Sequence, residues 1–350
     1  MRKTITVRGV QVGGGAPVAI QSMTNTKTAD VAATVDQIHC LVAAGCEIVR
    51  LAVPDLAAAK AFGAIRDRVA VPMVADIHFD YRLALEAVAA GADKIRINPG
   101  NIGDDDRIRQ VVRVCANRGL PIRIGVNGGS LEREIVAKYG HTPEAMVESA
   151  LGHAAILNRF DFDDICLSVK SSSVPDTVRA YRMLHARTGY PLHLGVTEAG
   201  TAYMGTVKNA MGIGSLLLDG IGDTIRVSLT ADPVEEIRAA RAILQSAGLR
   251  RFGPNIVSCP TCGRCEIDLI PLTDEVERRL EGSDREITVA VMGCGVNGPG
   301  EAKAADYGIA GGVGEGVLFR HGEIVGKAPM DKLIDALMDL ITEGEKDAYV

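Results

Sequence analysis

The chain has 350 residues, of which 47% are hydrophobic, and its formal net charge is −6 at pH 7. That length accommodates one large α/β domain and a smaller one, while the acidic balance argues against a nucleic-acid-binding protein, whose surface is normally basic. The sequence has no apolar leader and no apolar run long enough to span a membrane, so we expect a cytoplasmic protein without membrane contact.

Residues 17–230 alternate short β-branched segments with longer segments rich in alanine and leucine. Helices are expected between the strands, for example at 30–45 and 81–92. Eight β–α units in about 250 residues predict a closed (β/α)8 barrel of the TIM type rather than an open doubly wound sheet. The eight expected strands are 17–23, 47–53, 72–77, 94–100, 121–127, 164–170, 191–197 and 224–230.

A second domain is expected after the barrel. A helix predicted at 232–248 closes the first domain, 1–248, and residues 249–255 are typical of a linker. The remaining segment, 256–350, is expected to be a small α+β domain. Its predicted elements are a strand at 286–293, a hairpin at 317–327 that turns at a His-Gly pair, and an amphipathic helix at 329–344.

Polar residues recur two positions apart near the carboxyl ends of the expected barrel strands, with apolar residues between them. Residues two apart on a strand share a face, so in a barrel the polar set would face the interior and the mouth, where barrel active sites lie. The predicted mouth residues are Arg50, Asp76, His78, Arg96, Asn98, Arg123, Asn127, Ser168, Lys170, Arg226 and Ser228.

Five of these residues are cations: Arg50, Arg96, Arg123, Lys170 and Arg226. Buried charges without a partner are costly, so such a group predicts an anionic ligand. The alternative is that each cation pairs with a carboxylate of the chain, such as Asp76 or Glu198. For all five together we favour a small phosphorylated or diphosphorylated substrate.

The eight cysteines fall into two groups. The clustered group favours a metal over disulfides in a reducing compartment. A structural zinc site is one interpretation, but the glycine-rich turn around Cys294 offers backbone amides to cluster sulfides, which favours iron and sulfur. Apart from His78, the histidines show no ligand spacing and are expected to be structural or on the surface. The isolated cysteines, expected to be small buried hydrophobes, are Cys40, Cys46, Cys115 and Cys166, and the clustered ones are Cys259, Cys262, Cys265 and Cys294.

The two cysteine motifs also carry a family resemblance. SCPTCGR and GCGVNGPGEA follow a barrel that contains IQSMTNT, DIHFD, RINPGN, SVKSS and VTEAG. Together they resemble the bacterial 4-hydroxy-3-methylbut-2-enyl diphosphate synthase family of the methylerythritol phosphate route to isoprenoids, and the match runs through nearly the whole chain. The resemblance implies a barrel similar to that of dihydropteroate synthase, followed by an iron–sulfur domain.

For the metal site, the resemblance implies a [4Fe–4S] cluster held by Cys259, Cys262, Cys294 and Glu301. Cys265 departs from the family pattern and leaves the fourth ligand open between Cys265 and Glu301. A C-x2-C-x2-C loop is physically able to occupy three corners of a cluster. We favour Glu301, because a carboxylate is a more labile ligand and its release opens a site for substrate oxygen.

The resemblance further implies reductive ring opening of 2-C-methyl-D-erythritol 2,4-cyclodiphosphate, with flavodoxin or ferredoxin as electron donor. Glu198 is then expected to donate a proton or to orient substrate hydroxyls, and Asn297 to reach the substrate from the cluster turn. A homodimer in which the cluster domain of one subunit caps the barrel of the other is also implied.

Two other functions fit the same residues. A cluster-bearing sensor or electron-transfer module on a ligand-binding barrel would use Cys265 as a fourth thiolate and would not turn over substrate. A zinc-stabilised aldolase or synthase would form a Schiff base at Lys170.

Overall fold

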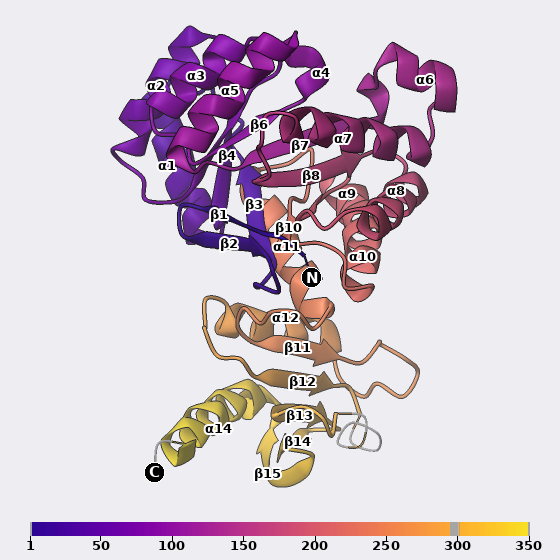
Figure 1. The fold of residues 1–350 in the computed structure, drawn as a ribbon. Helices are drawn as coiled ribbons and strands as arrows, with labels where there is room; N and C mark the ends of the chain where they lie inside the picture. Colours follow the sequence, from indigo (N-terminus) through magenta and orange to yellow (C-terminus); the bar gives the residue numbers. More distant parts are fainter. Residues whose placement is uncertain (1, 295–299, 301, 349–350) are drawn as a thin grey trace. The chain divides into compact units, whose positions relative to one another are not determined.

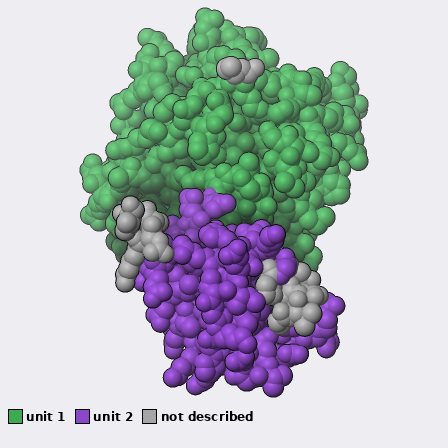
Figure 2. Space-filling model, turned by 90° about the horizontal axis from the view of Figure 1, so that it is seen from below, with its two compact units in different colours: residues 1–250 green, residues 251–350 purple. Residues whose placement is uncertain are grey.

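The structure, a computed structural model, describes residues 2–294, 300 and 302–348. The chain divides into two compact units, residues 1–250 and 251–350, which Figure 2 shows in green and purple. In the described part of the chain, no helix combines the length and the apolar character needed to cross a membrane.

The first unit is a parallel eight-stranded barrel with helices outside it (Figure 1). The strand order is β8-β7-β6-β5-β4-β3-β10-β9, and a parallel bridge between Leu167 and Leu192 joins β8 to the segment that leads into β9. The predicted barrel is thus confirmed, although the last two strands are only two residues long. The strands are β3 (Ala19–Met23), β4 (Ile48–Ala52), β5 (Met73–Asp76), β6 (Lys94–Ile97), β7 (Ile122–Asn127), β8 (Ile165–Lys170), β9 (His193–Leu194) and β10 (Thr224–Ile225).

Several barrel helices begin at a short polar side chain that accepts a hydrogen bond from a backbone N–H of the first turn. Asp30, Asp55 and Ser173 do this for α1, α2 and α8. Their apolar faces pack on the strands, which buries both sides of the sheet. The helical segments are α1 (Val31–Ala43), α2 (Leu56–Arg66), α3 (Tyr81–Ala89), α4 (Pro99–Ile102), α5 (Asp105–Arg118), η1 (Gly128–Ser130), α6 (Arg133–Tyr139), α7 (Pro143–Asn158), α8 (Val174–Arg187), α9 (Ala202–Asn209), η2 (Ala210–Gly214), α10 (Ser215–Leu218) and α11 (Pro233–Ser246).

A hairpin that the sequence analysis did not predict closes the amino-terminal end of the barrel. It consists of β1 (Thr4–Val7) and β2 (Val10–Gly13), which pair antiparallel. Its turn, Arg8–Gly9, has φ angles of 42° and 85°, as a two-residue type I′ turn requires. Apolar side chains of the hairpin pack against inward-facing residues of the strands, so the barrel has an apolar floor. The cluster contains Ile5, Val7, Val12, Ala19, Ile48, Val74 and Cys166.

The second unit is a mixed five-stranded sheet with the order β11-β12-β13-β14-β15. Helices α12 and α14 pack on one core with the sheet, and this core includes Leu269, Val291 and Leu337. The predicted hairpin is confirmed, and its turn residues His321 and Gly322 have φ angles of 49° and 80°. The elements are β11 (Asn255–Ser258), α12 (Leu269–Leu280), β12 (Thr288–Met292), β13 (Tyr307–Gly311), β14 (Glu315–Arg320), β15 (Glu323–Pro329), η3 (Met330–Lys332) and α14 (Leu333–Ala348).

Candidate active site

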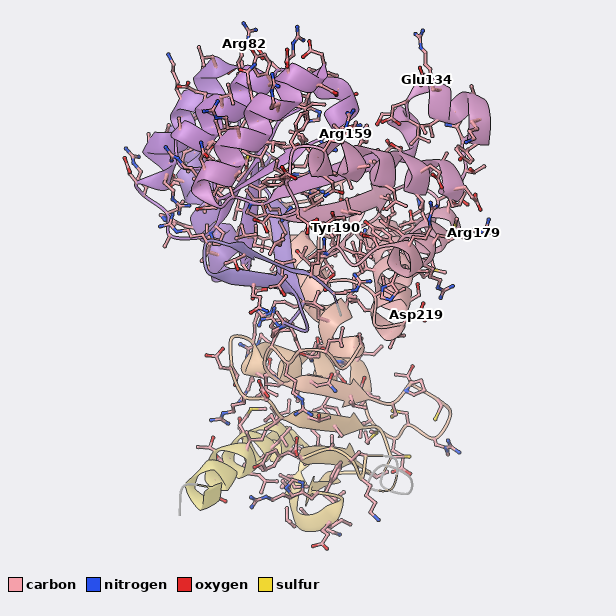
Figure 3. All side chains as sticks on the ribbon, in the orientation of Figure 1. Arg82, Glu134, Arg159, Arg179, Tyr190 and Asp219 are labelled. Carbon is pink, nitrogen blue, oxygen red and sulfur yellow. The ribbon has the colours of Figure 1, made fainter. Side chains whose placement is uncertain are left out.

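Most of the predicted mouth residues line one cavity of about 130 Å³ at the carboxyl ends of the barrel strands. Most charged side chains of this unit stand instead on the outer helices, as Arg82, Glu134 and Arg179 do in Figure 3. The charges in the cavity are therefore exceptional. The lining residues are Arg50, Asp76, His78, Arg96, Arg123, Gly125, Asn127, Ser168, Lys170, Thr197, Arg226 and Ser228.

Strand alternation and register bring these residues together. Arg96 lies opposite Arg123, and Asn127 lies opposite Lys170, in the parallel pairs β6–β7 and β7–β8. The residues between them, such as Ile97, are buried and belong to the other face of the strand. The period of two in the sequence is thus the direct cause of the cavity's polarity.

Asp76 is the carboxylate at the centre of this group. It accepts a hydrogen bond from Arg96 at 3.1 Å and lies 3.9 Å from Arg50 and 3.3 Å from His78. Burial by itself would raise the pKa of Asp76, but Arg50, His78 and Arg96 outweigh burial and hold the pKa well below its usual range. Asp76 is therefore ionised and neutralises part of the charge of the two arginines.

A second carboxylate, Glu236 in the first turn of α11, serves Arg226. The two side chains lie 3.1 Å apart, and Glu236 is only 4% exposed. Glu236 also accepts hydrogen bonds from the Ser22 hydroxyl and the Leu229 N–H, both at 3.1 Å. No sequence pattern marks Glu236 as a site residue, because an acidic residue in a first helical turn is typical of an ordinary helix start.

Arg123 and Lys170 have no carboxylate within ion-pair distance among the described residues. Arg123 is 1% exposed, and its Nε and one terminal nitrogen have no hydrogen-bond partner in that part of the chain. Burial, and then Arg123 and Arg50, hold the pKa of Lys170 well below its ordinary value. Burial and Arg96 likewise lower the pKa of Arg123 to about 10. The cavity therefore carries more positive charge than the protein itself compensates.

Two glycines make room for the long cations, and the sequence analysis did not single out this role. A Cβ atom on Gly195 would lie 2.5 Å from Lys170 Nζ, and one on Gly125 would lie 2.6 Å from Arg96 Nε. Neither distance is compatible with a real methyl group. Both glycines follow an apolar residue and precede valine, in IGVN and LGVT. This repeated context is the sequence signal that could have identified them.

Four predicted site residues lie elsewhere or outside the described residues. The Asn98 side chain caps α4 and accepts a hydrogen bond from the Gly100 N–H at 3.2 Å. Glu198 is exposed and follows the lining residue Thr197 with a left-handed φ of 53°. Asn297 and Glu301 lie outside the described residues.

The second unit brings two cysteine loops to the same edge of its sheet. β11 and β12 are parallel neighbours with Ser258 opposite Val291, so Cys259 and Cys294 follow adjacent strand ends. The Gly293 N–H donates a hydrogen bond to Cys259 Sγ at 3.2 Å. An N–H group directed at a cysteine sulfur is the interaction that stabilises a metal-bound thiolate.

Cys265 is engaged differently from the other clustered cysteines. Its Sγ donates to the Ile267 carbonyl at 3.2 Å, and a Cβ on Gly293 would lie 2.4 Å from that sulfur. Cys265 packs against the core of the second unit, as Cys259 also does. The Cys265 thiol is therefore held by contacts within its own loop and the core, whereas Cys262 is exposed.

The clustered thiols of the second unit fit an iron–sulfur cluster. In such a cluster each ligand binds its own iron atom, so the ligands stand farther apart than those of a single metal ion. Thiols on two adjacent loops, one with an amide donor, suit that arrangement.

The isolated cysteines behave as predicted except for one. Cys46, Cys115 and Cys166 are buried, but Cys40 is exposed. The prediction for Cys40 was wrong because its position on α1 faces away from the strands, beyond the buried stripe of that helix.

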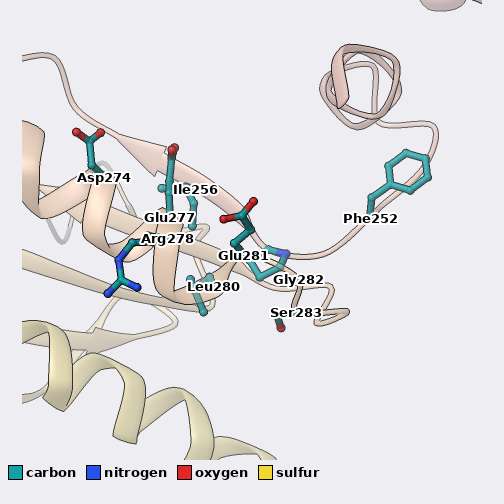
Figure 4. Close-up of a pocket in the computed structure, with 10 residues that line it drawn as sticks. Phe252, Ile256, Asp274, Glu277, Arg278, Leu280, Glu281, Gly282 and Ser283 are labelled. Carbon is teal, nitrogen blue, oxygen red and sulfur yellow. The ribbon is translucent and has the colours of Figure 1, made fainter. Parts of the chain in front are cut away.

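A larger hollow in the second unit takes no part in the site (Figure 4). Its lining includes the carboxylates Asp274, Glu277 and Glu281 beside Arg278. None of the predicted site residues lines it. An acidic surface hollow of this kind would repel the anionic ligand that the barrel cavity accommodates.

Comparisons with known proteins identify relatives of both units. The family model described as the GcpE TIM-barrel domain matches residues 2–241, and that of the GcpE protein C-terminal domain matches residues 255–343. The 4-hydroxy-3-methylbut-2-en-1-yl diphosphate synthase (flavodoxin) of Geobacter sulfurreducens is 59% identical over 345 residues, covering 98% of this chain and 97% of that protein. The protein of the same name from Ruminiclostridium cellulolyticum is 56% identical over 342 residues, with 97% of each chain covered.

Solved structures resemble the barrel. Dihydropteroate synthase from Stenotrophomonas maltophilia superposes with a TM-score of 0.51 at 14% identity, over 70% of this chain and 98% of that one. The enzyme from Vibrio fischeri gives 0.50 at 13%, with the same coverage. At such identities the likeness shows the fold alone.

Proposed function

The chain belongs to the GcpE family, and on that premise we propose that it is a flavodoxin-dependent 4-hydroxy-3-methylbut-2-en-1-yl diphosphate synthase. The substrate would be 2-C-methyl-D-erythritol 2,4-cyclodiphosphate. Two electrons and two protons open its ring and release one water, which leaves (E)-4-hydroxy-3-methylbut-2-enyl diphosphate.

The excess of positive charge in the barrel cavity is the observation that carries this proposal. Five cations are accompanied by two buried carboxylates, Asp76 and Glu236, and neither of these pairs with Arg123 or Lys170. A diphosphate would supply the missing negative charge, and a guanidinium group can donate two parallel hydrogen bonds to two oxygens of one phosphate. Ser168, Asn127 and Ser228 add hydroxyl and amide groups to the same lining.

Glu198 is proposed to deliver a proton to the departing oxygen or to orient the substrate hydroxyls. Glu198 follows Thr197, which lines the cavity, and its left-handed backbone conformation is rare for residues other than glycine. Strain of this kind gathers at functional sites. Glu198→Gln should therefore lower kcat strongly and leave the affinity for pyrophosphate, which lacks the hydroxyls, unchanged.

The second unit is proposed to hold a [4Fe–4S] cluster through Cys259, Cys262 and Cys294, with Glu301 as fourth ligand. When bound, such a cluster passes electrons one at a time from flavodoxin, or from ferredoxin, to the substrate. Cys265 is excluded from this role in the proposal because its thiol bonds the Ile267 carbonyl. The free thiols suit a reducing compartment, so we place the reaction in the cytoplasm.

Chemistry requires the cluster and the barrel cavity to meet, and we propose that they do so between two copies of the chain. Complementation tests this directly. Lys170→Ala disables the cavity and Cys294→Ser disables the cluster, so each homodimer should be inactive. An equal, re-equilibrated mixture should regain about a quarter of wild-type activity, because half of the dimers are mixed and each has one intact site. No recovery, with mixed dimers present by mass spectrometry, would place both parts of the site in one chain.

The activity itself is tested by anaerobic turnover of the cyclodiphosphate with chemically reduced flavodoxin. Product should form with the full-length chain and fail to form with Lys170→Ala. Lys60→Met, which removes an exposed charge on α2, is the matched control and should retain full activity. Binding of the cyclodiphosphate without product in the wild type would favour a sensor over an enzyme.

A further inference from the structure

Lys94 is a buried cation beneath the cavity that the proposed reaction does not use. It begins β6, two residues before Arg96, so both side chains point into the barrel. Lys94 is 0% exposed, and it is not a lining residue of the cavity. Its strand neighbour in β5 is Val74, which belongs to the apolar floor that the β1–β2 hairpin covers. The ammonium group is therefore closed off from solvent below.

The ammonium group of Lys94 also has no partner. In the described part of the chain, Nζ has no hydrogen-bond partner and no ion pair. Burial lowers the pKa of Lys94 to about 8; the Cys166 thiol opposes this shift, and the repulsion of Arg123 and Arg50 adds to it. The nearby Cys166 thiol opposes this shift only in part, because burial raises the pKa of that thiol.

This arrangement works against the stability of the fold. A buried ion without a partner is among the most unfavourable groups in a protein interior, and an apolar residue of similar volume would be better tolerated. Other inward positions of the floor, such as Ile48 and Val74, are apolar. Positions that violate the folding preference of their surroundings are typically functional.

We propose that Lys94 is a positioning residue of the diphosphate site, a buried cation that acts through Arg123 and is compensated only when an anionic ligand fills the cavity. The inference rests on the proposed function. The charge of Lys94, which lies below the cations that line the cavity, raises the electrostatic potential at the end of the cavity nearest the floor. One phosphate group of the ligand would lie at that end. In this proposal Arg123 carries the effect to the ligand, because it lines the cavity and its charge also repels that of Lys94.

Ligand binding should then change the protonation of Lys94. The charged and titratable groups that interact with Lys94 among the described residues are Arg50 on β4, Arg123 on β7, Cys166 on β8 and His193 on β9. Burial, Arg123, Lys170 and Lys94 hold the pKa of His193 well below its ordinary value, so this ring stays neutral. A bound anion opposes the repulsion that depresses the pKa of Lys94, and the site takes up a proton near pH 8.

The test is calorimetry with inorganic pyrophosphate on the anaerobically purified full-length chain. Titrations at pH 8 in two buffers of different ionisation enthalpy give both the Kd and the number of protons taken up. Lys94→Met removes the charge while keeping an unbranched side chain, and Lys60→Met on the surface of α2 removes the same net charge. Protons released by pyrophosphate itself cancel in the comparison of variants.

For Lys94→Met we expect a Kd about ten-fold higher than that of the wild type, with fewer protons taken up and a raised melting temperature. Lys60→Met should match the wild type. An unchanged Kd and unchanged proton uptake in Lys94→Met would overturn the role of Lys94. Failure of the wild type to bind pyrophosphate would instead overturn the diphosphate site itself. If Lys94→Met does not fold, Lys94→Gln is measured in its place, with the same expectations for Kd and proton uptake.

Discussion

Gly195 offers a direct test of how tightly the barrel interior is built around its cations. A Cβ atom at this position would lie 2.5 Å from Lys170 Nζ and 2.8 Å from the Arg226 backbone carbonyl. The lysine end can shift, but the carbonyl belongs to the barrel wall and cannot move without straining the sheet. Gly195→Ala therefore both displaces Lys170 and overpacks the interior.

The size of the effect follows from these contacts. Overpacking a well-packed core costs about 1–3 kcal/mol of unfolding free energy. For a unit of this size, each kcal/mol lowers the melting temperature by roughly 2–4 °C, so the expected loss lies between about 2 and 12 °C. Gly195→Ala would also move the Lys170 ammonium group away from its position in the cavity. Because one charge then no longer attracts the anion, the Kd for pyrophosphate should rise at least about ten-fold.

Two matched glycine variants control for the substitution itself. Gly125→Ala meets only side-chain atoms of Arg96 within 3.2 Å, so it should weaken binding with a smaller loss of stability. Gly152 lies exposed within α7 with nothing within 4 Å of its ideal Cβ. Gly152→Ala should therefore stabilise the chain by about 0.5–1 kcal/mol.

The assay is differential scanning calorimetry together with pyrophosphate titration of the three variants. From the highest to the lowest melting temperature, the expected order is Gly152→Ala, wild type, Gly125→Ala and Gly195→Ala. A Gly195→Ala protein with wild-type melting temperature and Kd would refute the reasoning, because it would mean that the interior has room for a methyl group beside Lys170.

Three further changes probe the groups around the site. Glu236→Gln leaves the half-buried Arg226 without its carboxylate, so the free energy of unfolding measured with urea should fall by about 2–4 kcal/mol. An unchanged free energy of unfolding would count against the pair. Burial alone would raise the pKa of Glu132, but its hydrogen bond with His153 outweighs burial and lowers the pKa from 4.5 to about 2. The ionised carboxylate therefore stabilises the fold above pH 4.5, and this stability is lost as the pH falls toward 2. Urea titrations at pH 6 and pH 3 should show a smaller drop for Glu132→Gln than for the wild type, and equal drops would contradict the pair. Cys265→Ser should keep full iron and acid-labile sulfide, because the Cys265 thiol bonds a backbone carbonyl, whereas loss of the cluster would make it a ligand.

Local sequence patterns are sufficient to predict the barrel and the polarity of its interior. A period of two in the side chains of a strand assigns each residue to a face, so Arg96, Arg123 and Lys170 could be placed in the mouth before any contact was known. The hairpin at His321 and Gly322 was equally local, because a two-residue turn needs residues that tolerate positive φ.

Other features depend on contacts between distant segments and were decided only by the tertiary structure. Glu236 meets Arg226 because α11 packs against β3, and no local pattern identifies which carboxylate reaches a given arginine. The ammonium group of Lys94 is unpaired among the described residues, and it is buried because the β1–β2 hairpin covers the barrel floor beneath it. The sequence states which side chain each position carries, and only the closed barrel determines which of those side chains are left without a partner.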